Sequence, residues 1–337
     1  MDLETVRKRA AEKLAGTCKV CRLCNGVACA GQVPGFGGVG TGSSFINNVE
    51  ALARRKLNLK VLHSVKEPDT RVRLFGMELS MPILGAAVAG VKVNKMNQMD
   101  EFELARAMIL GPRLAGTVGM GGDGGAPEVF QATLAATREA GGAAIPVIKP
   151  REQQALLERI GWAEEAGAFA VAIDVDAAAL INMALLGQKV EPKTRAQISE
   201  IVKATSRPVI LKGIMTPEDA VVAADAGAAG IVVSNHGGRA LDHTPGTADV
   251  LPEIVREVKG KVVILVDGGV RSGVDVLKML ALGADAVLVG RPLAIAAAGG
   301  GPLGVRLQLE EYAYQLKVAM ILTGCASVAD VSMSVLW

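Results

Sequence analysis

Residues 261–292 read KVVILVDGGVRSGVDVLKMLALGADAVLVGRP, and this stretch decides the fold. Two apolar, largely β-branched runs, VVILV and AVLV, each lead into a polar glycine turn. Between them lies a segment with helical spacing, GVDVLKMLALGA (273–284), which ends in Gly-Ala as a helix C-terminus does. Because the two runs are apolar throughout instead of alternating with polar residues, they predict parallel strands covered on both faces.

The same alternation of apolar strand and alanine-rich, charged helix recurs from about residue 82 onward. Eight strands are expected, at residues 82–87, 113–119, 143–149, 169–175, 208–213, 230–235, 261–268 and 285–290. Eight strand–helix repeats over roughly 250 residues match a (β/α)8 TIM barrel better than an open doubly wound sheet. We therefore predict an α/β protein with a barrel at residues 76–337 and an N-terminal helical, cysteine-rich extension at residues 1–75.

The composition narrows the class of protein. Only 3% of the 337 residues are aromatic, and 36 basic side chains nearly balance 34 acidic ones. With no long basic run and few aromatic side chains to stack on bases, we do not expect nucleic acid as a partner. The first residues lack the apolar core of a signal peptide, and no run of about 18 apolar residues occurs. We expect a soluble, cytoplasmic protein with no membrane span.

Polar residues gather where the predicted strands end, which is where TIM barrels carry their active sites. The seventh strand is followed by Asp267-Gly268-Gly269-Val270-Arg271, and the eighth by Gly290-Arg291-Pro292. Glycine lets backbone N–H groups approach an anion, and arginine adds charge-assisted hydrogen bonds. These are the loops that usually bind phosphate in this fold, so they predict a phosphorylated substrate or cofactor. The alternative is a pair of ordinary turns with surface arginines.

Three further side chains at strand ends have the chemistry of a catalytic site. Lys212, at the end of the fifth strand, can stabilise negative charge on a bound ring or enolate, or can pair internally with Asp174 or Asp176. His236 follows the sixth strand, and histidine is the commonest general base near neutral pH, although a lone histidine is often structural. Arg239 offers a planar fork for a carboxylate. A base and a carboxylate clamp on one loop suit removal of the α-proton from a carboxylic acid.

A cysteine cluster lies in the extension, where residues 18–29 read CKVCRLCNGVAC. Without an export signal disulfides are not expected, so four thiols in this short stretch suggest a metal centre. Its ligands would be Cys18, Cys21, Cys24 and Cys29. Their C-x2-C-x2-C-x4-C spacing is one residue from a ferredoxin run, which favours a [4Fe–4S] cluster over structural zinc. The alternative is a set of free thiols on a helix.

Several motifs resemble those of the FMN-dependent L-2-hydroxy acid oxidoreductases, the family of glycolate oxidase and lactate oxidase. They are SNHGGRALDHTPGTADVLPEI (234–254), LKGIMTPEDA (211–220), VDGGVRSGVDVLKMLALGADAVLVGRP (266–292) and TGCASVADV (323–331). The resemblance is strong over residues 207–331, weaker over 80–206 and absent before that. It implies an FMN-binding TIM barrel that oxidises an L-lactate-like 2-hydroxy acid or related carboxylate at its α-carbon. It also implies a homo-oligomer, commonly a tetramer.

The resemblance assigns roles to individual residues. His236 would be the base, oriented by Asp176, and Arg239 would bind the substrate carboxylate. Lys212 would lie against the flavin N1/O2 edge and stabilise the reduced, anionic ring. The remaining residues would contact the flavin: Ala87, Val88 and Ala89 behind the ring, Thr117 through its hydroxyl, Ser234 and Gly237 beside the ring, and Asp267, Gly268, Gly269, Arg271, Gly290 and Arg291 at the ribityl phosphate.

The sequence departs from the family on the substrate side. Residues 86–89 read AAVA in place of Ala-Pro-Met-Ala, and residues 144–146 read AIP in place of Gln-Leu-Tyr. A second substrate-binding arginine of the family falls near Met183, and the connection after Asp176 is much shorter than expected. Lys149 either replaces a lost polar contact in the barrel mouth or begins a surface turn.

Two other functions stay open at this point. One is a non-redox flavin isomerase resembling the type 2 isopentenyl diphosphate isomerases, which share the barrel and the FMN site. The other is a flavin- or cluster-binding sensor without turnover. An iron–sulfur cluster beside the flavin would give electrons an exit other than O2, which favours a dehydrogenase with an electron-transfer partner over an oxidase.

Overall fold

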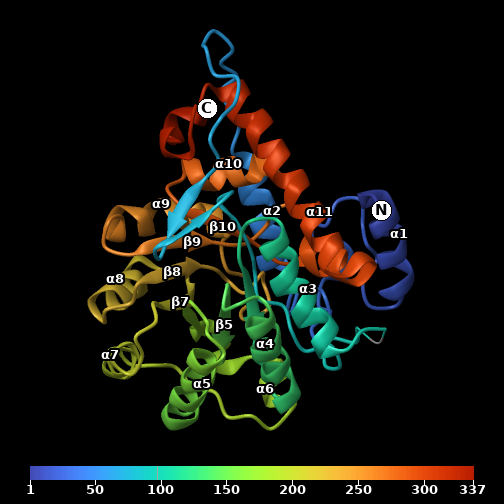
Figure 1. The fold of residues 1–337 in the computed structure, drawn as a ribbon, viewed down its shortest axis with the longest axis vertical. Helices are drawn as coiled ribbons and strands as arrows, with labels where there is room; N and C mark the ends of the chain where they lie inside the picture. Colours follow the sequence, from blue (N-terminus) through green and yellow to red (C-terminus); the bar gives the residue numbers. More distant parts are fainter. Residues whose placement is uncertain (97) are drawn as a thin grey trace.

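A computed structural model describes residues 1–96 and 98–337. Eight parallel strands form a closed barrel in the order β10-β3-β4-β5-β6-β7-β8-β9, which confirms the predicted TIM barrel (Figure 1). Each strand therefore pairs with its neighbour in sequence, and β10 closes the barrel on β3. The strands are β3 (Ile83–Gly85), β4 (Gly119–Gly122), β5 (Ala144–Ile148), β6 (Val171–Asp174), β7 (Val209–Ile214), β8 (Gly230–Val233), β9 (Val263–Val266) and β10 (Ala286–Val289).

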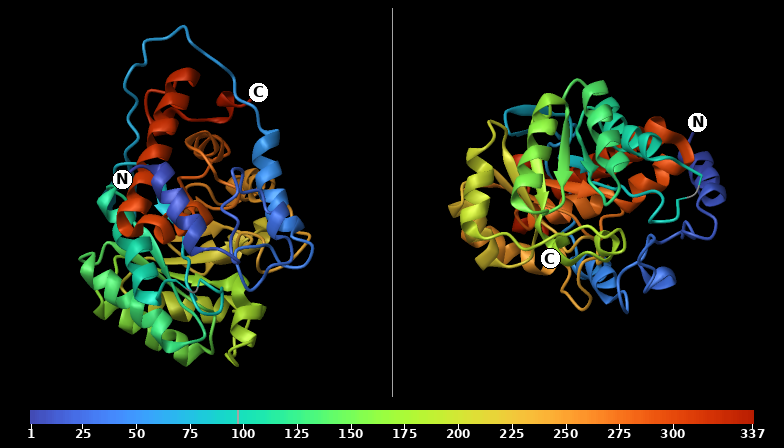
Figure 2. Two further views of the ribbon diagram at one scale, coloured as in Figure 1. Left: turned by 90° about the vertical axis from the view of Figure 1, so that its right-hand side faces the viewer. Right: turned by 90° about the horizontal axis from the view of Figure 1, so that it is seen from below.

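Every barrel strand is followed by at least one helix, and the helices cover the outside of the barrel (Figures 1 and 2). The longest helix, α11, is broken at Gly301, whose left-handed φ of 57° precedes Pro302. The helices are α3 (Glu101–Leu114), α4 (Pro127–Glu139), α5 (Gln153–Glu165), α6 (Ile181–Ala184), α7 (Arg195–Lys203), α8 (Pro217–Asp225), α9 (Thr247–Val258), α10 (Gly273–Ala281) and α11 (Arg291–Thr323).

The second strand lies later in the sequence than expected. The prediction placed it at 113–119, but α3 runs through Leu114 and β4 begins only at Gly119. The β4 sequence, GMGG, carries few side chains because neighbouring groups lie against it. A Cβ on Gly119 would overlap the Met108 carbonyl oxygen, and a Cβ on Gly122 would lie 2.6 Å from the Ala89 methyl group. Such a strand has little apolar signal for a sequence pattern to detect.

The first 75 residues pack onto the barrel and share its core. Helix α1 (Leu3–Lys13) lies against α11, and its Val6 belongs to the same buried cluster as the barrel helices. Helix α2 (Ser43–Arg54) follows a loop with one 3-10 turn, Val27–Cys29. The expected boundary after residue 75 falls inside a hairpin of β1 (Val72–Leu74) and β2 (Met77–Leu79). The extension and the barrel are therefore joined by a common core and a shared hairpin.

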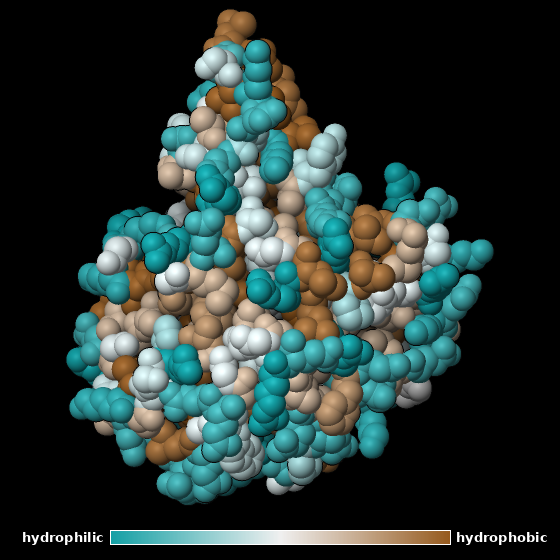
Figure 3. Space-filling model, viewed as in Figure 1, coloured by the Kyte–Doolittle hydropathy of each residue, from teal (hydrophilic) through white to brown (hydrophobic). Residues whose placement is uncertain are grey.

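The loop between α2 and β1, residues 55–71, projects from the end of the molecule that carries the C-terminus (Figures 1 and 2). Its apolar side chains are exposed, with Leu62 at 100% and Leu59 at 74% of their full accessibility. Figure 3 shows apolar surface at the tip of this projection and polar surface over most of the rest of the visible face. None of the helices in the described part of the chain combines the length and apolarity that crossing a membrane requires.

Candidate active site

A cavity of about 430 Å³ opens at the carboxyl ends of the barrel strands. A cavity of this size suits a small ligand or cofactor. Each of the eight strands contributes a lining residue at or just beyond its end: in strand order, Ala87, Asp123, Lys149, Asp174, Lys212, His236, Asp267 and Gly290. The polar strand ends therefore meet in one site.

Most residues singled out in the sequence line this cavity. Asp176 and Ser234 lie behind the lining: Asp176 contacts the His236 ring, and the Ser234 hydroxyl accepts a hydrogen bond from the Lys212 ammonium group at 3.5 Å. The lining residues are Ala87, Val88, Ala89, Lys212, His236, Gly237, Arg239, Asp267, Gly268, Gly269, Arg271, Gly290 and Arg291.

Thr117 lies away from this cavity, so its expected contact with the flavin is wrong. It precedes the first residue of β4 and lies at the amino end of the barrel, where it borders a separate hollow with Met77 and Phe169. Its hydroxyl is buried and donates to the Ile83 carbonyl at 2.8 Å. The misplaced second strand caused the error, because it put Thr117 near a carboxyl end.

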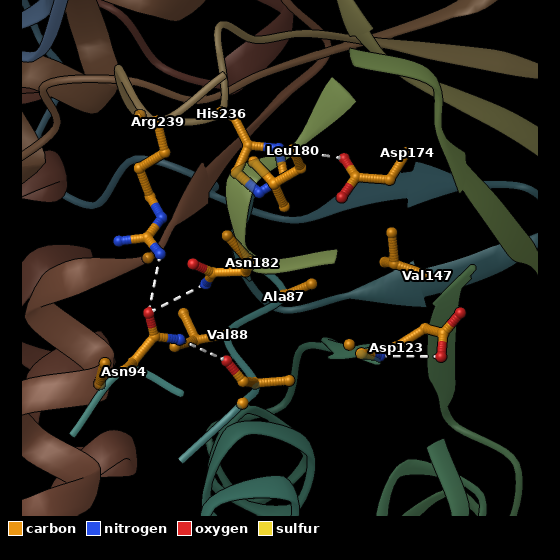
Figure 4. Close-up of a pocket in the computed structure, with 18 of the residues that line it drawn as sticks. Ala87, Val88, Asn94, Asp123, Val147, Asp174, Leu180, Asn182, His236 and Arg239 are labelled. Carbon is orange, nitrogen blue, oxygen red and sulfur yellow. Dashed lines mark hydrogen bonds and ion pairs between the residues drawn. The ribbon is translucent and has the colours of Figure 1, made fainter. Parts of the chain in front are cut away.

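The loop after β8 turns sharply at its histidine. His236, Gly237 and Gly238 all have left-handed backbones, with φ of 58°, 62° and 77°. Glycine adopts this conformation freely, whereas a histidine there is strained and needs support from its surroundings. The His236 N–H donates to the Ser234 hydroxyl at 3.1 Å, which supplies part of that support. The turn directs the imidazole into the cavity (Figure 4).

Two carboxylates fix the orientation of the imidazole. His236 Nδ1 lies 3.0 Å from an Asp176 oxygen and 3.5 Å from an Asp174 oxygen. With Nδ1 facing two acceptors, the neutral ring carries its proton there, so Nε2 holds the free lone pair. Among the described residues no hydrogen bond occupies Nε2, and this atom is available to a ligand.

A buried ion-pair network lies beside the histidine. Asp174 accepts from Lys149 Nζ at 2.5 Å and from Lys212 Nζ at 3.0 Å. Burial alone would raise the pKa of Asp174, but the neighbouring His236, Lys149 and Lys212 side chains hold it well below its usual range. Lys149 is thus buried in the barrel mouth, and the alternative of a surface turn is wrong. The predicted internal pair of Lys212 with Asp174 is present, and Lys212 lines the cavity as well.

The position of Lys212 depends on a β-bulge. The pairing of β7 with β8 shifts register between Lys212 and Ile214, and the intervening Gly213 has a φ of 109°. A Cβ at this glycine would lie 2.5 Å from Asp176. Bulges re-aim neighbouring side chains next to active sites, and this one needs glycine for both its backbone and the close approach of Asp176.

Three arginines around the cavity are held by neutral oxygen atoms. Arg239 donates to Asn94 Oδ1 at 2.8 Å, Arg291 to the Phe36 carbonyl at 2.7 Å, and Arg271 to the Cys24 carbonyl at 2.8 Å. In the described chain none of these three arginines pairs with a carboxylate. Lys149 and Lys212, by contrast, both pair with Asp174.

Burial of these charges without counter-ions is costly. Loss of hydration lowers the pKa of Arg239 to about 10, and loss of hydration together with the charges of Arg239 and Arg271 lowers that of Arg291 to about 9. An arginine in this state gains most when an anion binds beside it. The three guanidinium groups therefore predict anionic groups on the ligand.

The loops after β9 and β10 form a backbone cradle. Gly268 and Gly269 have left-handed φ values of 102° and 78°, and a Cβ on Gly269 would overlap the Asn48 carbonyl oxygen. Gly290 and Arg291, at the start of α11, line the cavity, and no side chain of the described residues caps this helix start. Such a helix start is a favourable phosphate site. The buried Asp267 Oδ1 has no hydrogen-bond partner within the part of the chain that the structure describes. As a carboxylate oxygen it suits a hydroxyl donor better than a phosphate.

The sequence did not single out two amides that complete the other side of the cavity. Figure 4 shows Asn94 between Asn182 and Arg239. Asn94 Oδ1 accepts from Asn182 at 3.2 Å and from Arg239 at 2.8 Å, which fixes the guanidinium in the cavity. Among the described residues the buried Asn182 Oδ1 finds no hydrogen-bond partner. Neither residue follows a barrel strand directly, so no strand-end signal could have identified them.

The four cysteines of the extension lie in an irregular segment. Helix α1 ends at Lys13, and only Cys29 belongs to a helical turn, so the helix expected in the alternative of free thiols is absent. Free thiols as such stay an alternative to a metal centre. All four sulfurs are reduced and partly exposed. Burial raises the pKa of the Cys18 and Cys29 thiols. The Cys24 carbonyl accepts from Arg271, which places this segment next to the cavity.

Comparison with known proteins gives consistent results. A family model described as FMN-dependent dehydrogenase matches residues 36–185 and 181–337. The 4-hydroxymandelate oxidase of Amycolatopsis orientalis is 34% identical over 333 residues, covering 87% of this chain and 89% of that protein. Glycolate oxidase 3 of Oryza sativa subsp. indica is 49% identical over 128 residues, which are 38% of this chain and only 35% of that protein.

The fold is also similar to a solved structure. A mandelate oxidase crystallised with (S)-2-phenylpropionate matches with a TM-score of 0.80 and 33% sequence identity, covering 100% of this chain and 97% of that chain. The match includes the barrel and the N-terminal extension, so the arrangement of the first 75 residues resembles that of the neighbour as well.

Proposed function

Because the chain belongs to the FMN-dependent dehydrogenase family, we propose that it oxidises a 2-hydroxy acid at the α-carbon to a 2-oxo acid. The observation that carries this proposal is the pair of His236 and Arg239 on one loop, facing one cavity. Arg239 and the two other arginines of this cavity lack carboxylate partners in the described chain. A free imidazole nitrogen and a guanidinium fork are what α-proton removal from a carboxylic acid needs.

The residues present fit FMN. Arg271, Arg291, the glycine turn 268–269 and the start of α11 offer charge and N–H donors for its phosphate, and Asp267 offers its unpartnered oxygen to a hydroxyl of the ribityl chain. Ala87, Val88 and Ala89 leave room for a flat ring against the β3 end of the cavity. FMN, when bound, accepts the two electrons of the oxidation.

The substrate carboxylate binds Arg239 in this proposal. Asn94 and the Gly35 carbonyl hold two of the guanidinium nitrogens, which leaves N–H donors directed at the cavity. A carboxylate on these donors neutralises the buried charge of Arg239, whose loss of hydration lowers the pKa of Arg239 to about 10. The clamp thus fixes one end of the substrate and leaves its α-carbon near the His236 ring.

His236 takes the proton through Nε2. Its Nδ1 hydrogen remains with Asp176 and Asp174, and the same two carboxylates stabilise the positive ring that forms. Lys212 places a positive charge beside the bound cofactor, where the charges of Asp174, Asp176 and Asp267 raise its pKa despite burial, so it stays protonated.

The substrate side of the cavity favours a small apolar substituent. Val88, Leu180, Met183 and Leu186 line it beside the Asn182 amide. We therefore propose an L-lactate-like aliphatic 2-hydroxy acid over a charged one. The relatives named above are oxidases, which does not support the alternative of an isomerase, and a complete base and clamp do not favour a sensor without turnover.

The test is anaerobic reduction of the bound flavin by a panel of L- and D-2-hydroxy acids. We expect at least one acid to bleach the flavin of the wild type, and His236→Ala to slow the bleaching by roughly 10²–10⁴-fold. His243→Ala is the matched control, because His243 is exposed and lies outside the cavity. Bleaching of His236→Ala at the wild-type rate would show that the base is assigned wrongly.

The remaining expectations are proposals as well. The exposed Leu59 and Leu62 of the projecting loop support a homo-oligomer, because exposed apolar side chains commonly mark contact surfaces. The tetramer, the cytoplasmic location and the electron-transfer partner stay predictions. A metal centre on the four cysteines is a separate proposal.

A further inference from the structure

We propose that Cys18, Cys21, Cys24 and Cys29 bind a [4Fe–4S] cluster beside the phosphate end of the flavin site, and that the cluster passes electrons from the flavin to an external one-electron carrier. The metal site stands on the cysteine segment itself. The electron route rests on the proposed function, because it needs a substrate that reduces the flavin.

The cysteine segment is held in place by arginines from outside it. Arg7 of α1 donates to the Val20 carbonyl at 3.2 Å and to the Cys21 carbonyl at 2.9 Å. Arg271 donates to the Cys24 carbonyl at 2.8 Å. A segment without regular secondary structure is thus fixed at three successive points, which leaves its thiols free for another partner.

The first C-x2-C turn has a strained backbone. Val20 has a left-handed φ of 44°, which is an outlier for a β-branched residue. The turn brings the Val20 N–H to within 3.4 Å of Cys18 Sγ, so the backbone donates to the sulfur. N–H donors to cysteine sulfur are among the features that tune iron–sulfur clusters. The strain is explained if the turn must present the sulfur to a metal.

The described sulfurs are not gathered as tightly as the ligands of a single zinc ion. Four thiolates about 2.3 Å from one zinc ion would lie about 3.8 Å from each other. Among the residues that the structure describes, no three cysteine sulfurs lie within 4.8 Å of one another. Within the described chain the sulfurs therefore do not form a zinc-sized tetrahedron, and a four-iron cluster is larger and holds its ligands further apart.

The segment lies one layer of side chains from the flavin site. Arg271 contacts Cys24 and lines the cavity, so a single guanidinium separates the two. A Cβ on Gly37 would overlap the Cys29 carbonyl oxygen, and Gly37 in turn accepts from Arg291 at 2.9 Å. Both arginines that face the proposed phosphate thus contact the cysteine segment or the loop packed on it.

The oxidation releases two electrons that must leave the flavin before the next turnover. Oxidation of the hydroxyl carbon breaks one C–H and one O–H bond, forms a carbon–oxygen double bond and releases two protons and two electrons. His236 takes one proton, and the two electrons reach the flavin together with the other proton, which passes to solvent when the flavin is reoxidised. A [4Fe–4S] cluster exchanges one electron at a time, so it would deliver them singly to a soluble protein carrier with an iron–sulfur or flavin centre.

The test uses the full-length protein purified without oxygen, and again after incubation with ferrous iron and sulfide. We expect about four iron atoms and four acid-labile sulfides per chain, with a broad visible absorption beyond that of flavin. Cys24→Ser and, as a second variant at another turn, Cys29→Ser should lose the iron and keep the FMN. Cys325→Ser is the matched control, because Cys325 is a buried free thiol that lies outside the cysteine segment of residues 18–29.

Two results would overturn the metal site: zinc at about one atom per chain without iron, or no metal after reconstitution while the variants and wild type show the same thermal melting. The electron route is tested by electron paramagnetic resonance after adding the best hydroxy acid. A cluster that stays oxidised while the flavin bleaches refutes the route. Iron without any flavin bleaching counts against the proposed function and leaves the metal site supported.

Discussion

Replacement of Arg239 by methionine tests the carboxylate clamp most directly. Methionine keeps most of the length and apolar contact of the side chain but removes the charge and every N–H donor. Hydrogen bonds to charged groups contribute about 1.5–3 kcal/mol each, so loss of a two-bond fork costs about 3–6 kcal/mol. Each 1.4 kcal/mol or so is a factor of ten, so we expect kcat/KM to fall roughly 10²–10⁴-fold.

The assay is stopped-flow flavin reduction with the best acid of the panel, run anaerobically. Arg239→Lys keeps the charge without the fork and should fall between methionine and wild type. Asn94→Ala keeps the fork but removes the oxygen that orients it at 2.8 Å, so KM should rise more than kcat falls. Arg256→Met, on the exposed face of α9, is the control.

One result would refute this reasoning. If Arg239→Met reduces kcat/KM less than tenfold while retaining FMN, the substrate carboxylate binds elsewhere in the cavity. Lys149 would then be the next candidate, because its ammonium group lines the same cavity.

Three further changes test other parts of the site. Asp176→Asn removes the carboxylate 3.0 Å from His236 Nδ1 but leaves Asp174 at 3.5 Å. We therefore expect kcat to fall roughly 10²-fold with little change in KM. An unchanged kcat in steady-state assays would contradict the orienting role. Gly269→Ala forces a Cβ against the Asn48 carbonyl at a φ of 78°, so we expect a loss of about 1–3 kcal/mol in stability and a lower flavin content, measured by thermal melting and absorbance. The Arg239 guanidinium is charged below its pKa of about 10 and neutral above it, so KM should rise as pH increases through that value; a KM that stays flat to pH 11 would argue against an arginine clamp.

The strand ends show how far sequence reasoning can reach. A barrel strand buried on both faces must be apolar, so a polar residue near or just after its end, such as Lys212, His236 or Asp267, stands out in the sequence. The parallel topology then brings all these ends to one face without further information. The same reasoning failed at β4, since glycines packed against Met108 and Ala89 have no side-chain pattern to read.

The sequence by itself determined the barrel, and it placed the glycine turns, His236 and Arg239 at the carboxyl ends of the strands, because each of these depends on residues that are neighbours along the chain. Only the tertiary structure decided that Lys149 and Lys212 share Asp174, that Asn94 orients Arg239, and that the cysteine segment contacts Arg271. These contacts join residues far apart in the sequence. Their geometry depends on the closure of the barrel and on the folding of the extension over its mouth, which no local pattern encodes.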